Sequence, residues 1–136
     1  MATFARQLAA SGFLVVAPEV KEIAQLTVQP MVVERAEEAF NAVVASPSFA
    51  KFEKWGFVSA SFSAGVGLIL LSRPTVKARV RTALLVGPYA RFQQTAEYAA
   101  TSFERDNYAA LVLLGNYLGL VLDDTLAIRL ALFRGA

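Results

Sequence analysis

The sequence contains no cysteine and no histidine among its 136 residues. The absence of cysteine excludes disulfides, thiolate metal sites and cysteine nucleophiles, and leaves the redox compartment open. The absence of histidine removes the commonest general base and the commonest metal ligand. No G-x-G-x-x-G motif follows an apolar run either, so nothing indicates a dinucleotide site. We therefore expect no metal and no cofactor.

Charge is also scarce, since only 18% of the residues are charged and the net charge is +2. Such a balance gives no reason to expect nucleic-acid binding. The longest apolar stretch, Tyr108 to Leu122, contains Asn116 and is shorter than the roughly 20 residues of a membrane span. The N-terminus lacks the pattern of a secretory signal, so the expected compartment is the cytoplasm. A hydrophobic content of 56% excludes intrinsic disorder, and a length of 136 residues predicts one domain over residues 1–136.

Short apolar runs alternate with helical patterns along the chain. The predicted strands are 13–17, 56–61 and 82–86, and the predicted helices are 3–10, 30–45, 64–72, 91–105 and 107–133. The run over 13–17 is continuously apolar, which is typical of a strand buried on both faces of a parallel sheet, and we expect all three strands to be of this buried type. The sequence thus predicts an α/β class with a three-stranded parallel sheet flanked by helices. Residues 1–90 would form the core and residues 91–136 a helical segment that acts as a lid or packs on the core.

One segment combines residues in a pattern that suggests chemistry. Ser61-Phe62-Ser63-Ala64-Gly65 lies where the second predicted strand turns into a helix. A nucleophile on a sharp strand-to-helix turn needs small residues two positions away on each side, and Ser61 and Gly65 meet this need around Ser63. The helix that follows would direct its first N–H groups at the reacting oxygen. We therefore interpret Ser63 as a candidate nucleophile.

Ser61 to Gly65 resembles the G-x-S-x-G turn of the α/β-hydrolase superfamily, with Ser61 in place of the first glycine. The run from Gly12 to Glu19 is also similar to a strand of dienelactone-hydrolase-like esterases, and the resemblance covers about residues 3 to 90. It implies a partial α/β-hydrolase fold, an ester or thioester substrate, Ser63 as nucleophile and the backbone N–H of Ala64 as an oxyanion donor.

The same resemblance implies a triad acid and a histidine after later strands, and a second oxyanion donor in an earlier loop. The sequence has no histidine, and Asp123 and Asp124 fall in a helical pattern that favours a solvated turn or helix face. We therefore expect an internal fragment of an esterase-like hydrolase, inactive as this chain. The alternative is a non-catalytic α/β interaction domain or degenerate hydrolase relative, which associates with itself or another chain through an uncovered sheet edge or its apolar C-terminal helices.

Overall fold

The computed structural model describes residues 2–89, 91–101 and 107–117. In these residues two strands are embedded among helices, and the chain order of the elements is α1 (Ala2–Ala10), α2 (Lys21–Ala24), α3 (Met31–Ala45), the 3₁₀ turn η1 (Pro47–Phe49), β1 (Trp55–Ala60), α4 (Phe62–Leu70), α5 (Pro74–Lys77), β2 (Val80–Val86), α6 (Phe92–Thr101) and α7 (Asn107–Tyr117). The fold is a small mixed α/β arrangement. No helix in these ranges is long and apolar enough to cross a bilayer.

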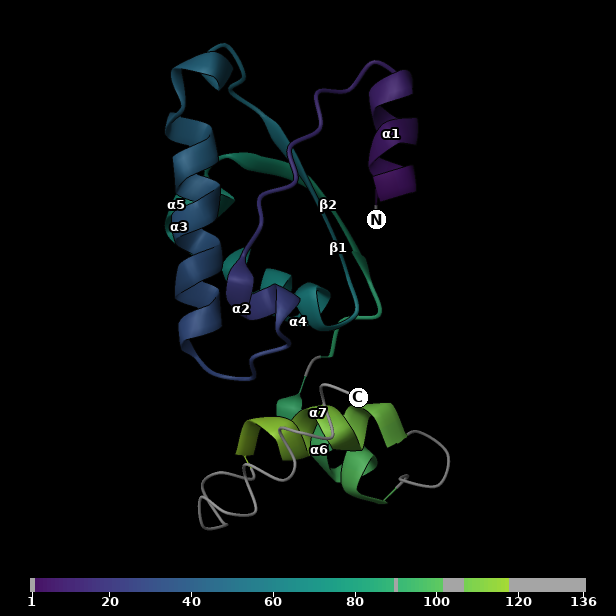
Figure 1. The fold of residues 1–136 in the computed structure, drawn as a ribbon. Helices are drawn as coiled ribbons and strands as arrows, with labels where there is room; N and C mark the ends of the chain where they lie inside the picture. Colours follow the sequence, from purple (N-terminus) through teal and green to yellow (C-terminus); the bar gives the residue numbers. More distant parts are fainter. Residues whose placement is uncertain (1, 90, 102–106, 118–136) are drawn as a thin grey trace.

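The two strands run parallel and are joined through α4 and α5. Phe57 lies opposite Ala83, and Ala60 lies opposite Val86 at the carboxyl end of the pair. The strand order is β1-β2, so the described sheet has two strands. Figure 1 shows α3 on one side of the strands and α1 on the other, with α6 and α7 beyond the carboxyl ends of the strands.

The prediction of a three-stranded sheet is wrong. Residues 13–17 carry no strand assignment, although they were expected to form the first strand, and Phe13 and Leu14 are 64% and 50% exposed. An apolar, β-branched run shows only that a segment suits a pleated, half-buried surface. A strand also needs a neighbouring strand for its N–H and C=O groups, and the sheet of the described residues contains β1 and β2 alone. The expected partial hydrolase sheet is therefore not present in them.

The other elements follow the sequence patterns more closely. The helices expected over 3–10 and 30–45 are confirmed as α1 and α3, and the last two predicted strands are confirmed as β1 and β2. Two short helices, α2 and α5, were missed in segments expected to be loops, because one helical turn is too short to show a period. The predicted helix over 107–133 is confirmed to Tyr117, and its remainder lies outside the described residues.

The core lies between α3, α4 and α5, on one side of the sheet. Its buried members are Val32, Val33 and Ala36 of α3, Val66 and Leu70 of α4, and Val76 of α5. The members of α3 recur at three- to four-residue spacing, which gives that helix one apolar stripe. This packing holds α4 in place, and with it the turn between β1 and α4.

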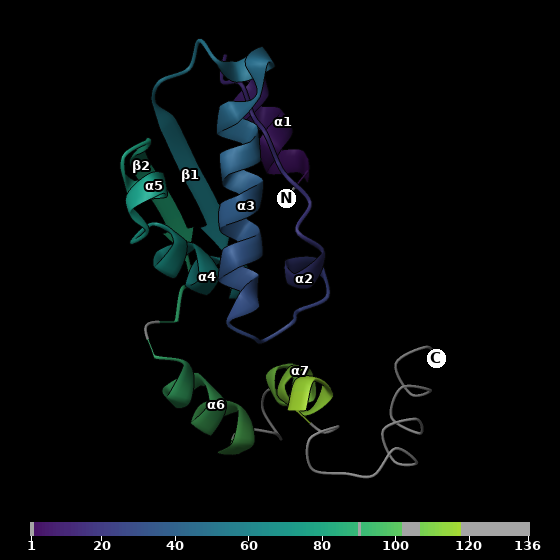
Figure 2. The ribbon, with the colours of Figure 1, turned by 90° about the vertical axis from the view of Figure 1, so that its left-hand side faces the viewer.

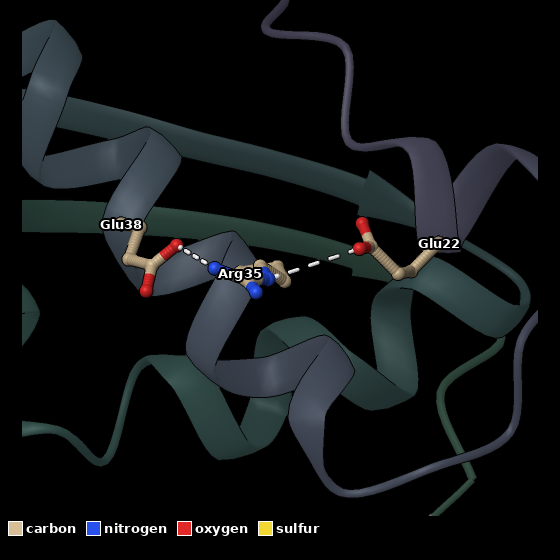
Figure 3. A network of polar contacts seen from close by, with 3 residues as sticks. All are labelled: Glu22, Arg35 and Glu38. Carbon is tan, nitrogen blue, oxygen red and sulfur yellow. Dashed lines mark hydrogen bonds and ion pairs between the residues drawn. The ribbon is translucent and has the colours of Figure 1, made fainter.

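Polar contacts connect α3 to its neighbours at the surface. Figure 3 shows Arg35 between two carboxylates, with its Nη1 atom 2.8 Å from Glu38 and its Nε atom 3.8 Å from Glu22 of α2. The hydrogen bond to Glu38 is the main reason that the pKa of Arg35 is raised. Because Arg35 and Glu38 are exposed, the contacts orient α2 on α3 and add little to stability.

Candidate active site at the strand-to-helix turn

The turn between β1 and α4 is strained at Ser61. This residue has φ 54° and ψ −131° and separates the last residue of β1 from the first of α4. Residues other than glycine rarely adopt a positive φ, and such conformations cost about 1–3 kcal/mol and cluster at functional sites. The Ser61 N–H donates to the carbonyl oxygen of Val86 at 2.8 Å, so β2 holds the strained backbone in place. Ser61 is exposed to solvent.

Ser63 lies in the first turn of α4 and has a different environment. Its hydroxyl donates to the carbonyl oxygen of Ala60 at 2.7 Å and accepts a hydrogen bond from the Ser59 hydroxyl at 2.9 Å. Ser59 itself is 5% exposed. The Ser63 hydroxyl therefore provides hydrogen-bond partners for the buried Ser59 hydroxyl and for the Ala60 carbonyl oxygen at the end of β1. This is a structural role for a serine side chain. Its predicted role as nucleophile stays a prediction.

The expected oxyanion donor is also engaged. The Ala64 N–H donates to the carbonyl oxygen of Ser61 at 2.9 Å, and the Gly65 N–H donates to the same oxygen at 3.3 Å. The N–H groups of the first helical residues have no acceptor inside a helix. The N–H groups of Phe62 and Ser63 hold those first positions of α4, so they are the donors that α4 can offer to an anion beside Ser61.

The sequence pattern predicts Ser61 only as the small residue two positions before the nucleophile. The stretch from Ser59 to Gly65 contains two overlapping frames with a central serine and small residues two positions away, one centred on Ser61 and one on Ser63. Composition cannot separate these frames. The positive φ, the exposure and the position directly after β1 distinguish Ser61.

Gly65 leaves room for an aromatic ring. A Cβ atom at Gly65 would overlap Cζ of Tyr89, so a side chain here would displace that ring. Tyr89 lies beside Phe62 and Phe92, with ring centroids 6.4 Å and 6.1 Å away. Burial raises the pKa of Tyr89, so its hydroxyl remains protonated at neutral pH. The chain after β2 therefore packs directly on the first turns of α4.

A cavity of about 270 Å³ lies beside this turn. Apart from Gln29, its walls are apolar or aromatic side chains. They come from the chain leading into α3, from α3 and α4, from the chain around Tyr89, and from α6 and α7, and comprise Val28, Gln29, Pro30, Val32, Val33, Phe62, Val66, Ile69, Tyr89, Phe92 and Tyr117. In open α/β sheets ligands bind outside the carboxyl ends of the strands, and this cavity lies next to that end of β1.

Helix α7 is fastened to the chain that leads into α3. The Asn116 amide accepts a hydrogen bond from the Val28 N–H at 2.9 Å and donates to the carbonyl oxygen of Leu26 at 2.9 Å. Tyr117 donates its hydroxyl to the Val28 carbonyl oxygen at 2.6 Å. Leu26 has φ 54°, so this clamp holds a second strained residue. Figure 2 shows α6 and α7 together below the strands and α3, and these contacts fix α7 as one wall of the cavity.

The described residues do not complete a catalytic set. They contain no cluster of three or more potential metal-ligating side chains. Asp123 and Asp124 lie outside the described residues. No family model, curated protein or solved structure matches the chain.

Proposed function

We propose that this chain is an esterase-like acyl-transfer domain in which Ser61 is the nucleophile. The observation that carries the proposal is the positive φ of an exposed serine between a strand and a helix. A serine in this position presents its hydroxyl at the end of the sheet and next to free N–H groups of the helix. The resemblance of the surrounding residues to α/β-hydrolases supports the same class of reaction.

In the proposed reaction the Ser61 oxygen attacks the carbonyl carbon of an ester or thioester. The new C–O bond forms as the hydroxyl proton passes to a base, and the carbonyl electron pair moves onto oxygen. The Phe62 and Ser63 N–H groups stabilise that oxyanion. When the carbonyl re-forms, the alcohol or thiol leaves with a proton, and water then hydrolyses the acyl-serine to a carboxylic acid and free Ser61.

The base is the component that this sequence does not supply in its usual form, because it has no histidine. We assign the base to a group outside the described residues, in another segment or a partner chain. A serine without a base still benefits from a preformed oxyanion site, since such sites retain roughly 10³–10⁴-fold catalysis when triad members are removed. The exposure of Ser61 also leaves it open to a base added in solution.

The test is covalent labelling with a fluorophosphonate, with and without free imidazole as an external base. We expect an adduct on Ser61, located by peptide mass spectrometry, that forms faster when imidazole is added. Ser61→Gly is the informative variant because glycine accepts the positive φ, so the fold is kept while the hydroxyl is removed. It should abolish the adduct.

Ser63→Ala is the matched control two residues away. It removes the hydrogen bonds to Ala60 and from the buried Ser59 and should cost about 1–3 kcal/mol of stability, but it should leave labelling intact. An adduct on Ser63 would reverse the roles of the two serines. Labelling of Ser61 no faster than that of the exposed Ser72 would refute an acyl-transfer role for this turn.

A second candidate function is an interaction domain without catalysis. One observation favours it: Val58, Leu84 and Val86 are 41%, 50% and 56% exposed on the same face of the sheet. Neighbouring exposed apolar side chains are typical of surfaces that bind other chains. This function would be supported instead if the fluorophosphonate labels Ser61 no faster than Ser72 and the chain self-associates in sedimentation.

A further inference from the structure

We propose that the cavity beside α4 holds the hydrocarbon tail of the acyl group that is transferred at Ser61, and that the tail is a straight chain of at least six carbons. This inference rests on the proposed function and adds a substrate class to it. The cavity and the nucleophile are linked through Phe62, whose side chain lines the cavity and whose N–H belongs to the residue directly after Ser61.

The chemistry of the walls selects an apolar group. The side chains that face the cavity include Val66 and Ile69 of α4, Val33 of α3, and the rings of Phe62, Tyr89 and Phe92. A charged or strongly polar group placed here would lose its hydration without enough partners in return. The Tyr117 hydroxyl is occupied by the Val28 carbonyl oxygen, so it does not turn a donor toward the interior.

The volume sets a minimum length for the tail. A closed apolar cavity of about 150 Å³ accommodates benzene, a group of six carbons. The 270 Å³ found here therefore accommodates a chain of at least six carbons. The cavity is not enclosed, so such a chain can enter it from the solvent.

The clamp made by Asn116 and Tyr117 gives the cavity a fixed wall. Because Asn116 bonds to the backbone on both sides of Thr27, the segment next to Val28 is held by three hydrogen bonds to α7. A pocket whose wall is held in this way is largely formed before the ligand arrives, which is typical of small-molecule sites.

The experiment is a binding titration that needs no reaction. Hexanamide is the probe, since it carries the six-carbon acyl group and cannot acylate the serine under these conditions. Methyl NMR of valine and isoleucine side chains follows the full-length chain as hexanamide is added. We expect saturable shifts of the Val66 and Ile69 methyl signals, while those of Val58 and Val86, on the other face of the sheet, remain in place.

Two neighbouring residues provide a matched pair of variants. Ile69→Phe puts a larger side chain into the cavity and should weaken hexanamide binding at least tenfold. Leu68→Phe makes the same addition one residue earlier on α4, at a side chain that is 43% exposed and does not line the cavity, and should leave binding unchanged. Acetamide, which lacks the tail, should bind at least tenfold more weakly than hexanamide.

The outcomes separate this inference from the proposed function. Ser61→Gly should bind hexanamide as the original chain does, because the tail and not the hydroxyl provides the contacts. If Ser61 is labelled but hexanamide shifts no cavity methyl, or shifts Val58 and Val86 equally, the tail site is wrong and the nucleophile stands. If hexanamide binds in the cavity but Ser61 is not labelled, the site binds apolar chains and the acyl-transfer role is wrong.

Discussion

The two faces of the β1–β2 pair have similar side chains and very different environments. On one face Phe57 and Leu85 pack against α4, and a Cβ atom on Gly67 would lie 2.7 Å and 3.4 Å from them. On the other face Val58, Leu84 and Val86 are 41% to 56% exposed. Successive residues of a strand point to opposite faces, so each strand contributes to both environments.

The difference shows that the apolar character of a strand does not determine whether it is buried. β2 was expected to be a buried strand, yet most of its residues are exposed. What buries a side chain here is the presence of α4, which is tied to β1 by a turn of a single residue and therefore always covers the same face. The following predictions test this contrast with substitutions on the side that α4 covers and on the uncovered face.

The largest effect is expected from leucine truncation. Leu70 is 2% exposed in the core, whereas Leu84 is 50% exposed on the uncovered face. Leu70→Ala should lower the free energy of unfolding by about 2–5 kcal/mol, because it removes buried methyl groups and leaves a cavity. Leu84→Ala should lower it by less than about 1 kcal/mol. Urea unfolding measures both, and equal losses would mean that the two faces are equally covered.

The sequence predicts the covered face better than the uncovered one. The helix over 30–45 shows its apolar stripe in the spacing of Val32, Val33 and Ala36, and those residues are the ones that the structure buries. Local periodicity is enough for such an element, because the helix makes its own backbone hydrogen bonds. The prediction of a strand over 13–17 is wrong because a strand depends on a neighbouring strand that can lie far away in the sequence. A local pattern contains no information about that neighbour.

The site shows the same limit at the scale of one turn. The sequence locates a strand, a tight turn and a helix around residues 55–70, and the structure confirms these elements. It does not distinguish Ser61 from Ser63, because both have small neighbours at the right spacing. The backbone angle that separates them occurs together with a hydrogen bond from the Ser61 N–H to β2, which is a tertiary contact. The clamp from Asn116 to Leu26 joins residues 90 positions apart and has no sequence signature.

A smaller effect is expected from adding bulk at glycine. Gly67→Leu should destabilise the fold by about 1–3 kcal/mol, because the new side chain meets the Phe57 ring inside the covered face. Gly56→Leu places the same side chain on β1 where the nearest atom is the Thr82 carbonyl oxygen at 4.0 Å. Its effect should be neutral or stabilising by up to about 1 kcal/mol, since glycine weakens a strand. Thermal unfolding of both variants measures these effects. A loss of stability for Gly56→Leu would show that other side chains already pack on the second face.

The smallest effect on stability is expected from placing a charge on the uncovered face. Leu84→Lys should change the free energy of unfolding by no more than about 0.5 kcal/mol, because half of the Leu84 side chain is already in water. The same variant should reduce self-association in sedimentation velocity, since an ammonium group opposite an apolar surface must lose its hydration. Thr82→Leu is the reverse control, which adds an apolar side chain to the same exposed face of the same strand and should increase association. A large loss of stability for Leu84→Lys would mean that another part of the chain covers this face. The two faces would then both be buried, and they would differ only in which segment covers each.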